Sequence, residues 1–226
     1  MIDEYNTALL LSVAYLAPYV NANSITMLAK DEVFKLVEMY DDEALRYVKI
    51  NNMKTVPLES ILEEAYVLCN ETLINVGLYE GGYIPSESLL KYRSICNRMV
   101  GLHTHPIPLP IPTPEDLISM KQIGYNIECV LSRIDESKAK MICIEPLDDF
   151  RNVLNSMLIF SKVIYSLVDR YIVVEDELGV QFLPYPTNKS LQRIEEELVS
   201  LMKRKCRLNI VSLDMKKNEY DIIAVL

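Results

Sequence analysis

Five prolines alternate with other residues between positions 106 and 114, in the run PIPLPIPTP. Proline lacks the backbone N–H that a strand ladder needs, and its ring fixes φ, so this segment cannot lie inside a sheet or a helix. The sequence therefore predicts a strand over MVGLHTH, residues 99–105, that ends where the prolines begin. The chain then leaves the sheet as a stiff, extended loop and enters a helix over PEDLISMKQI, which Gly124 closes.

Both histidines of the chain, His103 and His105, lie on this expected strand. Successive side chains of a strand point to opposite faces, so the two imidazoles share one face and Thr104 is turned away. The helix start has two readings: Thr113 and Asp116 form a capping box, or the same geometry turns the Asp116 carboxylate toward the imidazoles. In the second reading a His/His/Asp set leaves one tetrahedral position open, as catalytic zinc sites do. A pair of solvated or hydrogen-bonded histidines is the alternative.

Composition excludes several classes of function. Half of the 226 residues are apolar, enough for a sizeable core, and 32 acidic residues against 23 basic ones give a net charge of -9. The first basic residue is Lys30, so we expect no positive stripe and no nucleic-acid partner. The apolar run ALLLSVAYLAPYV is shorter than the ~20 residues of a spanning helix and has no basic leader. It predicts a packing helix, and we expect no membrane contact.

The chain has five cysteines, an odd and scattered set without a CxxC motif: Cys69, Cys96, Cys129, Cys143 and Cys206. This pattern predicts reduced, buried thiols and a cytoplasmic location rather than a disulfide framework. A structural zinc site with Cys96 or Cys129 as fourth ligand is an alternative that spacing along the chain does not exclude.

Helical and strand patterns interleave along the chain. An amphipathic helix is expected over residues 29–40, followed by a hairpin of EALRYVKI and MKTVPLES. The segment 60–85 stays open between helix and strand, and a helix is expected over 86–98. Strands are expected over 126–135 and 139–146, a helix over about 148–169, a hairpin over 171–186, a helix over about 190–204, and strands over 207–214 and 219–226. This order predicts an α/β (α+β) fold, a mixed sheet flanked by helices.

The segment HTHPIPLPIPTPED resembles the motif of the JAMM (MPN+) zinc metalloproteases, which reads H-[ST]-H-P, six residues, Ser, two residues and Asp. The residues that match are His103, Thr104, His105, Pro106, Thr113 and Asp116, with Thr113 where the family usually has serine. The resemblance covers roughly residues 24–185. It implies an MPN/JAMM-type sheet with a cytidine-deaminase-like core, residues 1–23 as a helix packed on it, and residues 186–226 as a C-terminal α/β extension. It also implies one Zn²⁺ per chain, bound by His103, His105 and Asp116.

The family uses a glutamate on the first strand after an amphipathic helix as general base. In this sequence Glu43 stands at the entry of the expected strand, and the resemblance assigns it that role. Glu59, Glu63 and Glu64 are competitors that rank lower, because they lie in or beside a presumed insertion. Glycines often follow the family's glutamate, whereas ALRYVKI follows Glu43. The Thr113 hydroxyl would then donate to the developing oxyanion.

The function that the resemblance implies is zinc-dependent hydrolysis of isopeptide or peptide bonds at the C-terminus of ubiquitin or a ubiquitin-like modifier. The chain thus looks like a deubiquitinase-type isopeptidase, acting as a homodimer or a complex subunit. The alternatives are a non-catalytic MPN scaffold in a larger assembly and a JAMM hydrolase of a sulfur-carrier protein or a small amide. Enzymes of this family bind the modifier's tail at a sheet edge, for which TLINVGLY with Gly81 and Gly82 is the candidate. A buried connector is the other reading of that segment.

Overall fold

The computed structural model describes residues 2–80 and 84–225; Gly81 and Gly82, where the sequence predicts a mobile point, lie outside them. The described residues contain a mixed sheet of seven strands, in which β5 and β6 are parallel and the other neighbours antiparallel. In spatial order the strands are β11 (Glu219–Val225), β10 (Cys206–Asp214), β7 (Lys138–Pro146), β6 (Ile127–Arg133), β5 (Met99–His105), β3 (Leu62–Cys69) and β4 (Thr72–Glu80). The prediction of a mixed α/β fold is confirmed.

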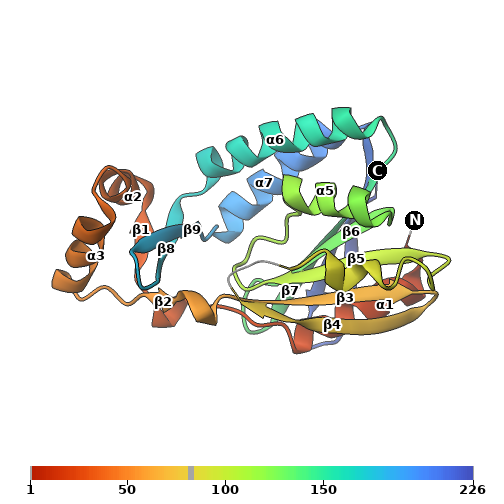
Figure 1. Cartoon of the computed structure of the whole chain (residues 1–226), viewed down its shortest axis with the longest axis horizontal. Coiled ribbons are helices and arrows are strands. Elements are labelled where there is room, and N and C mark those ends of the chain that lie inside the picture. The colour runs from red at the N-terminus through yellow and green to blue at the C-terminus, as the bar shows by residue number, and fades with distance from the viewer. Residues whose placement is uncertain (1, 81–83, 226) are drawn as a thin grey trace.

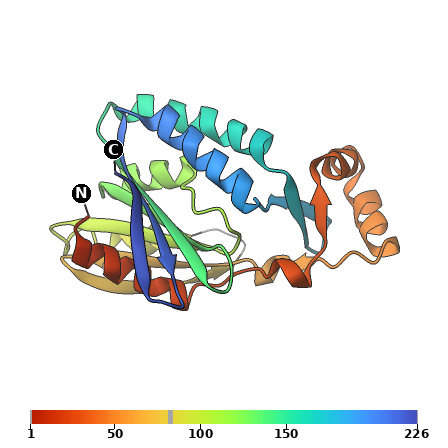
Figure 2. The same ribbon diagram turned by 180° about the vertical axis from the view of Figure 1, so that it is seen from behind.

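Helices cover both faces of this sheet (Figures 1 and 2). On one face lies α1 (Glu4–Leu11), continued by the 3-10 turn η1 (Ser12–Tyr15), and it buries Leu10, Leu11 and Val13 against the strands. The other face carries α5 (Pro114–Ile123), α6 (Phe150–Leu167) and α7 (Asn188–Met202). An N-terminal helix therefore packs on the sheet, but it covers only the first part of the apolar run and ends at Leu11. Among the described residues, no helix has the length and apolar character needed to cross a membrane.

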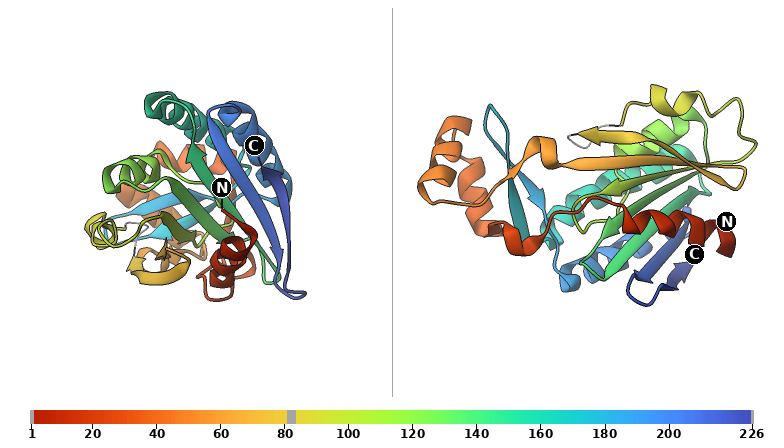
Figure 3. Two further views of the ribbon diagram at one scale, coloured as in Figure 1. Left: turned by 90° about the vertical axis from the view of Figure 1, so that its right-hand side faces the viewer. Right: turned by 90° about the horizontal axis from the view of Figure 1, so that it is seen from below.

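A second, four-stranded sheet lies at one end of the molecule, where Figure 3 shows it apart from the main sheet. It consists of β1 (Met27–Ala29), β8 (Arg170–Glu175), β2 (Val56–Pro57) and β9 (Val180–Pro184). The helices α2 (Lys30–Val37) and α3 (Asp41–Ile50) accompany it (Figure 1). Residues 186–226, expected as a C-terminal helix and strand extension, contain α7, β10 and β11, and β10 pairs along its whole length with β7 of the main sheet.

The strand expected over EALRYVKI is wrong, because these residues belong to helix α3. The three acidic residues Asp41, Asp42 and Glu43 occupy its first turn and Lys49 its last, an arrangement that the helix dipole favours. Ala44 and Val48, four positions apart, form its buried face. The expected hairpin partner MKTVPLES is also wrong: it contains only the short β2, parallel to β8, and the 3-10 turn η3 (Leu58–Ser60).

The segment left open between helix and strand is the antiparallel hairpin β3–β4. Its outer strand β4 contains TLINVGLY and forms one edge of the main sheet. The register shifts between Ala65 and Tyr66, so Val76 has no partner in β3 and Gly77 follows the bulge. The helix expected over 86–98 is limited to the single turn α4 (Glu87–Leu90), with turns after it.

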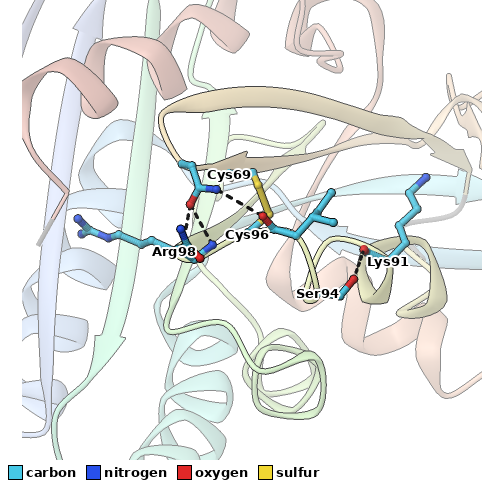
Figure 4. The surroundings of a disulfide bond; sticks show 8 residues. Cys69, Lys91, Ser94, Cys96 and Arg98 are labelled. Atoms are coloured by element: carbon cyan, nitrogen blue, oxygen red, sulfur yellow. Dashed lines mark hydrogen bonds between the residues drawn. A yellow bond between two sulfur atoms is a disulfide. The ribbon is translucent and has the colours of Figure 1, made fainter.

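Two disulfides contradict the prediction of reduced thiols. Cys69, at the end of β3, is bonded to Cys96 in the loop that follows α4 (Figure 4). Cys129 and Cys143 are bonded across the register of β6 and β7, where they face each other directly. Cys206 is a free, buried thiol. Both cysteines considered as zinc ligands are thus in disulfides, and neither supplies a thiolate to a metal.

Candidate metal centre

Strand β5 holds His103 and His105 on the face of the sheet that α5 covers, as the two-residue spacing predicts. Both side chains are buried, and their Nε2 atoms lie 3.1 Å apart. Two nitrogens bound to one tetrahedral zinc lie roughly 3.3 Å apart, given Zn–N bonds of about 2.0–2.1 Å. The separation of the two Nε2 atoms therefore matches that of two ligands of one small cation.

The other ring nitrogens of these histidines both have acceptors. His103 Nδ1 lies 2.8 Å from Oε1 of the buried Glu128, and His105 Nδ1 lies 2.8 Å from the Leu109 carbonyl oxygen. A carbonyl oxygen only accepts, so the proton of a neutral His105 is on Nδ1, and the carboxylate gives His103 the same tautomer. Histidine ligands of metals almost always have such a partner, which fixes the ring and leaves the Nε2 lone pair for the metal.

Charge in the centre favours a cation. With both protons on Nδ1, two Nε2 lone pairs would face each other at 3.1 Å and repel, so a proton or a metal ion is needed between them. Burial alone would lower the pKa of His103, but the carboxylates of Asp116, Glu128 and Glu63 raise it to about 10. The same negative surroundings would attract a divalent cation.

Glu63 reaches this centre from the neighbouring strand. Ala65 pairs with His103 in the antiparallel register of β3 and β5, so the residues two positions further out, Glu63 and His105, lie side by side on the same face. The Glu64 N–H donates to Thr104 Oγ1 at 2.9 Å and extends the contact between the strands to this point. Glu63 Oε1 lies 3.9 Å from His105 Nε2. The ligand atoms of Glu63, His103 and His105 all lie within 4.8 Å of one another, so these residues could hold a metal ion.

Asp116 approaches from the first turn of α5, where the predicted capping box is confirmed. Thr113 Oγ1 accepts from the Asp116 N–H at 3.2 Å, and Asp116 Oδ2 accepts from the Thr113 N–H at 2.6 Å and from its hydroxyl at 2.8 Å. Asp116 Oδ2 also lies 3.5 Å from His103 Nε2. The capping and the metal-facing readings of Asp116 are therefore compatible: the cap orients the carboxylate beside His103. The Thr113 hydroxyl is directed at Asp116 rather than at open space.

Glu43 does not lie at this centre. It is in the first turn of α3, beside the small sheet, and Figure 1 shows α3 at the opposite end of the molecule from β5 and α5. The resemblance led to Glu43 because a strand was expected there, and the chain forms a helix instead. Of the competing glutamates, the structure brings Glu63 to the histidines. Glu64 points to the other face of β3, where its Oε2 accepts from the Tyr66 hydroxyl at 2.6 Å.

Glu128 and Tyr125, which hold the His103 ring through hydrogen bonds, were not identified from the sequence. Glu128 in β6 is 3 % exposed, and its second carboxylate oxygen accepts a short hydrogen bond from the Tyr125 hydroxyl. Burial and the Glu128 charge raise the pKa of Tyr125 well above its ordinary value, so the phenol stays a donor. Gly101 makes room for this pair, because a Cβ there would lie 2.5 Å from Glu128 Oε2 and 2.7 Å from the Tyr125 ring. An acid inside the apolar strand IECVLSR was the available signal, since a buried glutamate needs a partner.

The donor set suits a borderline cation: two imidazoles whose Nδ1 atoms are held by buried partners, with the carboxylates of Asp116 and Glu63 beside them. A metal ion at Nε2 would replace the proton that the carboxylates favour on His103. This arrangement can bind a metal and can place a carboxylate next to a water on it. Comparisons with models of protein families, with curated proteins and with solved structures found no match to this chain.

Proposed function

We propose that the chain is a zinc-dependent hydrolase of amide bonds, with the MPN/JAMM-type arrangement that the HTHP motif implies. The observation that carries the proposal is the meeting of four side chains from three elements: Glu63 from β3, His103 and His105 from β5, and Asp116 from α5. The histidine and aspartate positions match the motif's spacing. Glu63, which lies outside the motif, supplies a second carboxylate, the one that a general base requires.

In this proposal His103, His105 and Asp116 bind zinc and Glu63 is the general base. Zinc held in this way supplies a Lewis acid that lowers the pKa of water to about 7 and polarises a carbonyl. Asp116 is assigned as ligand because it matches the motif, lies 3.5 Å from His103 Nε2 and is fixed by its cap; Glu63 lies 3.9 Å from the other imidazole, at His105 Nε2. Glu63 Oε1 would take the proton of the attacking water and deliver it to the leaving amine.

Thr113 has a supporting role in this centre. Its hydroxyl donates to Asp116 Oδ2 in the structure, so its first effect is to hold that carboxylate in place. A rotation of the hydroxyl would let it donate to a developing oxyanion instead, the role that the resemblance gives it. In either role a serine would serve as well as a threonine.

The substrate class that we propose is a protein or peptide with an extended C-terminal tail, such as a ubiquitin-like modifier conjugate. The exposed edge strand β4 supports this class, since an extended tail can pair with such an edge. β4 belongs to the same hairpin as β3, which carries Glu63. A tail paired with β4 would therefore run two strand spacings, roughly 10 Å, from the strand that carries the proposed base. A small amide is the second candidate, favoured by the cavity described in the next subsection.

The proposal is tested by incubating zinc-loaded protein with a panel of substrates and measuring cleavage. The panel contains ubiquitin and ubiquitin-like fusions and small N-acyl amides. We expect cleavage of at least one class, lost in His103→Ala together with the metal and lost in Glu63→Gln with the metal retained. A zinc-loaded protein that cleaves no member of the panel would favour the non-catalytic scaffold. Cleavage that survives in His103→Ala would place the reaction elsewhere.

A further inference from the structure

An apolar cavity of about 270 Å³ lies directly beside the candidate metal centre. Glu63, His105 and Thr113 line this cavity and also a second, more polar one of about 400 Å³, whose walls include His103 and Asp116. The two cavities thus meet at the residues that would surround the reacting bond. A ligand at the metal can extend into the apolar cavity without leaving the protein.

The walls of the apolar cavity come from rigid parts of the chain. Every second residue of the proline-rich loop is apolar and buried, and the N–H groups of Leu109 and Ile111 donate to carbonyls two residues back, at 2.7 and 2.9 Å. Helix α6 faces the loop with residues spaced three and four positions apart. The lining residues from these two elements include Ile107, Leu109, Ile111, Met157, Phe160 and Ile164. Such a wall is formed before any ligand binds, which lowers the entropy cost of binding.

We propose that this cavity is the specificity pocket of the enzyme and binds one bulky apolar side chain, of leucine, methionine or phenylalanine type, at a residue adjoining the scissile amide. An engineered cavity of about 150 Å³ holds a benzene molecule, so about 270 Å³ accommodates a side chain of this size. The apolar lining penalises a charged side chain, which would lose its hydration there. The inference rests on the proposed function, because the scissile bond is the one that the metal centre would cleave.

Binding is tested apart from turnover, with two probes that differ in one side chain, N-acetyl-leucinamide and N-acetyl-glycinamide. Burial of a leucine side chain predicts that the first binds at least about tenfold more tightly than the second. Ligand-observed NMR on the zinc-loaded protein measures both. Equal binding of the two probes would overturn the proposal.

Ser161 in α6 lines the cavity and lies outside the metal centre, and its hydroxyl donates to the Leu158 carbonyl of its own helix. Ser161→Trp fills the cavity, so we expect the preference for the leucine probe to fall to less than about twofold while zinc content is unchanged. Ser161→Ala, the matched control, leaves the cavity open and should keep the preference. If Ser161→Trp unfolds, Gln181→Trp blocks the same cavity from an exposed position on β9. A tryptophan variant that folds and keeps the preference would place the side chain elsewhere.

The result separates this inference from the proposed function. If the protein hydrolyses nothing but prefers the leucine probe, and Ser161→Trp removes that preference, then the pocket is supported and the proposed reaction is wrong. If hydrolysis depends on Glu63 but the two probes bind equally, then the proposed reaction is supported and the pocket is wrong.

Discussion

Glu63 in β3 and Glu43 in α3 show how differently two regions of one chain relate to the same site. Glu63 lies beside His105 because the antiparallel register of β3 and β5 fixes their positions. Glu43 lies on a helix next to the small sheet, at the far end of the molecule (Figure 1). The glutamate that a family pattern selects by its order along the chain is therefore the distant one, and the glutamate that strand pairing selects is the near one.

In this protein, strand register locates the glutamate beside the histidines, whereas order along the sequence does not. The residues 43–50, expected as a strand, belong to helix α3 and pair with neither sheet. A strand next to β5 has little freedom of register, because slipping it by one residue would turn its buried side chains to the wrong face.

The largest effect is expected on turnover. Glu63→Gln keeps the size of the side chain and removes the proposed base, so the rate of the proposed amide hydrolysis should fall by about two orders of magnitude or more. Glu43→Gln, the control in the other region, should leave the rate unchanged. Rates are measured with zinc-loaded protein on whichever substrate of the panel is cleaved. A fall in Glu43→Gln with a normal rate in Glu63→Gln would reverse the assignment.

A smaller effect is expected on metal affinity. Glu128→Gln removes the charge that orients His103, and loss of such a partner typically weakens metal binding by about 10- to 100-fold. Glu64→Gln alters the other tyrosine–glutamate hydrogen bond, on the opposite face of β3, and should leave zinc affinity within about twofold. Competition with a chelator of known affinity measures both variants. An equal loss of zinc affinity in Glu128→Gln and Glu64→Gln would show that Glu128 affects the metal only by stabilising the fold.

The smallest effect is expected on folding. Thr113→Val removes the side-chain cap of α5 and should lower the free energy of unfolding by about 1 kcal/mol, whereas Thr113→Ser should restore most of it. Tyr40 is the N-cap of α3 but makes no side-chain cap bond, and it is 79 % exposed. Tyr40→Ala should change stability by less than about 0.5 kcal/mol. Urea denaturation gives both values, and a Thr113→Val variant as stable as the wild type would contradict the role of the cap.

Local patterns predicted the parts of the fold that local chemistry determines. The prolines after His105 end β5, and the capping box and Gly124 set the two ends of α5. α1 packs as its apolar run indicates. The pairing of β3 with β5 was not predictable in this way, because it depends on contacts between segments distant in sequence. Sequence patterns alone therefore do not place Glu63 beside His105 or Glu128 beside His103.

The prediction of reduced thiols was wrong for the same reason. Cys129 and Cys143 face each other only once β6 and β7 are in register, and the contact of Cys69 with Cys96 depends on the loop after α4. The spacing of cysteines along the chain predicts neither contact. An odd number of cysteines implies at least one free thiol, which is Cys206, but it does not determine whether the other four form disulfides.

The most direct test of the account is the zinc content of the purified protein and of its single variants, measured by elemental analysis. We expect about one zinc per chain in the wild type, in Glu43→Gln and in Glu63→Gln, and little in His103→Ala, His105→Ala and Asp116→Asn. Zinc lost in Glu63→Gln but kept in Asp116→Asn would make Glu63 a ligand and leave the proposed reaction without its base. A wild-type chain that binds no zinc, or histidine variants that both keep it, would contradict the metal centre itself.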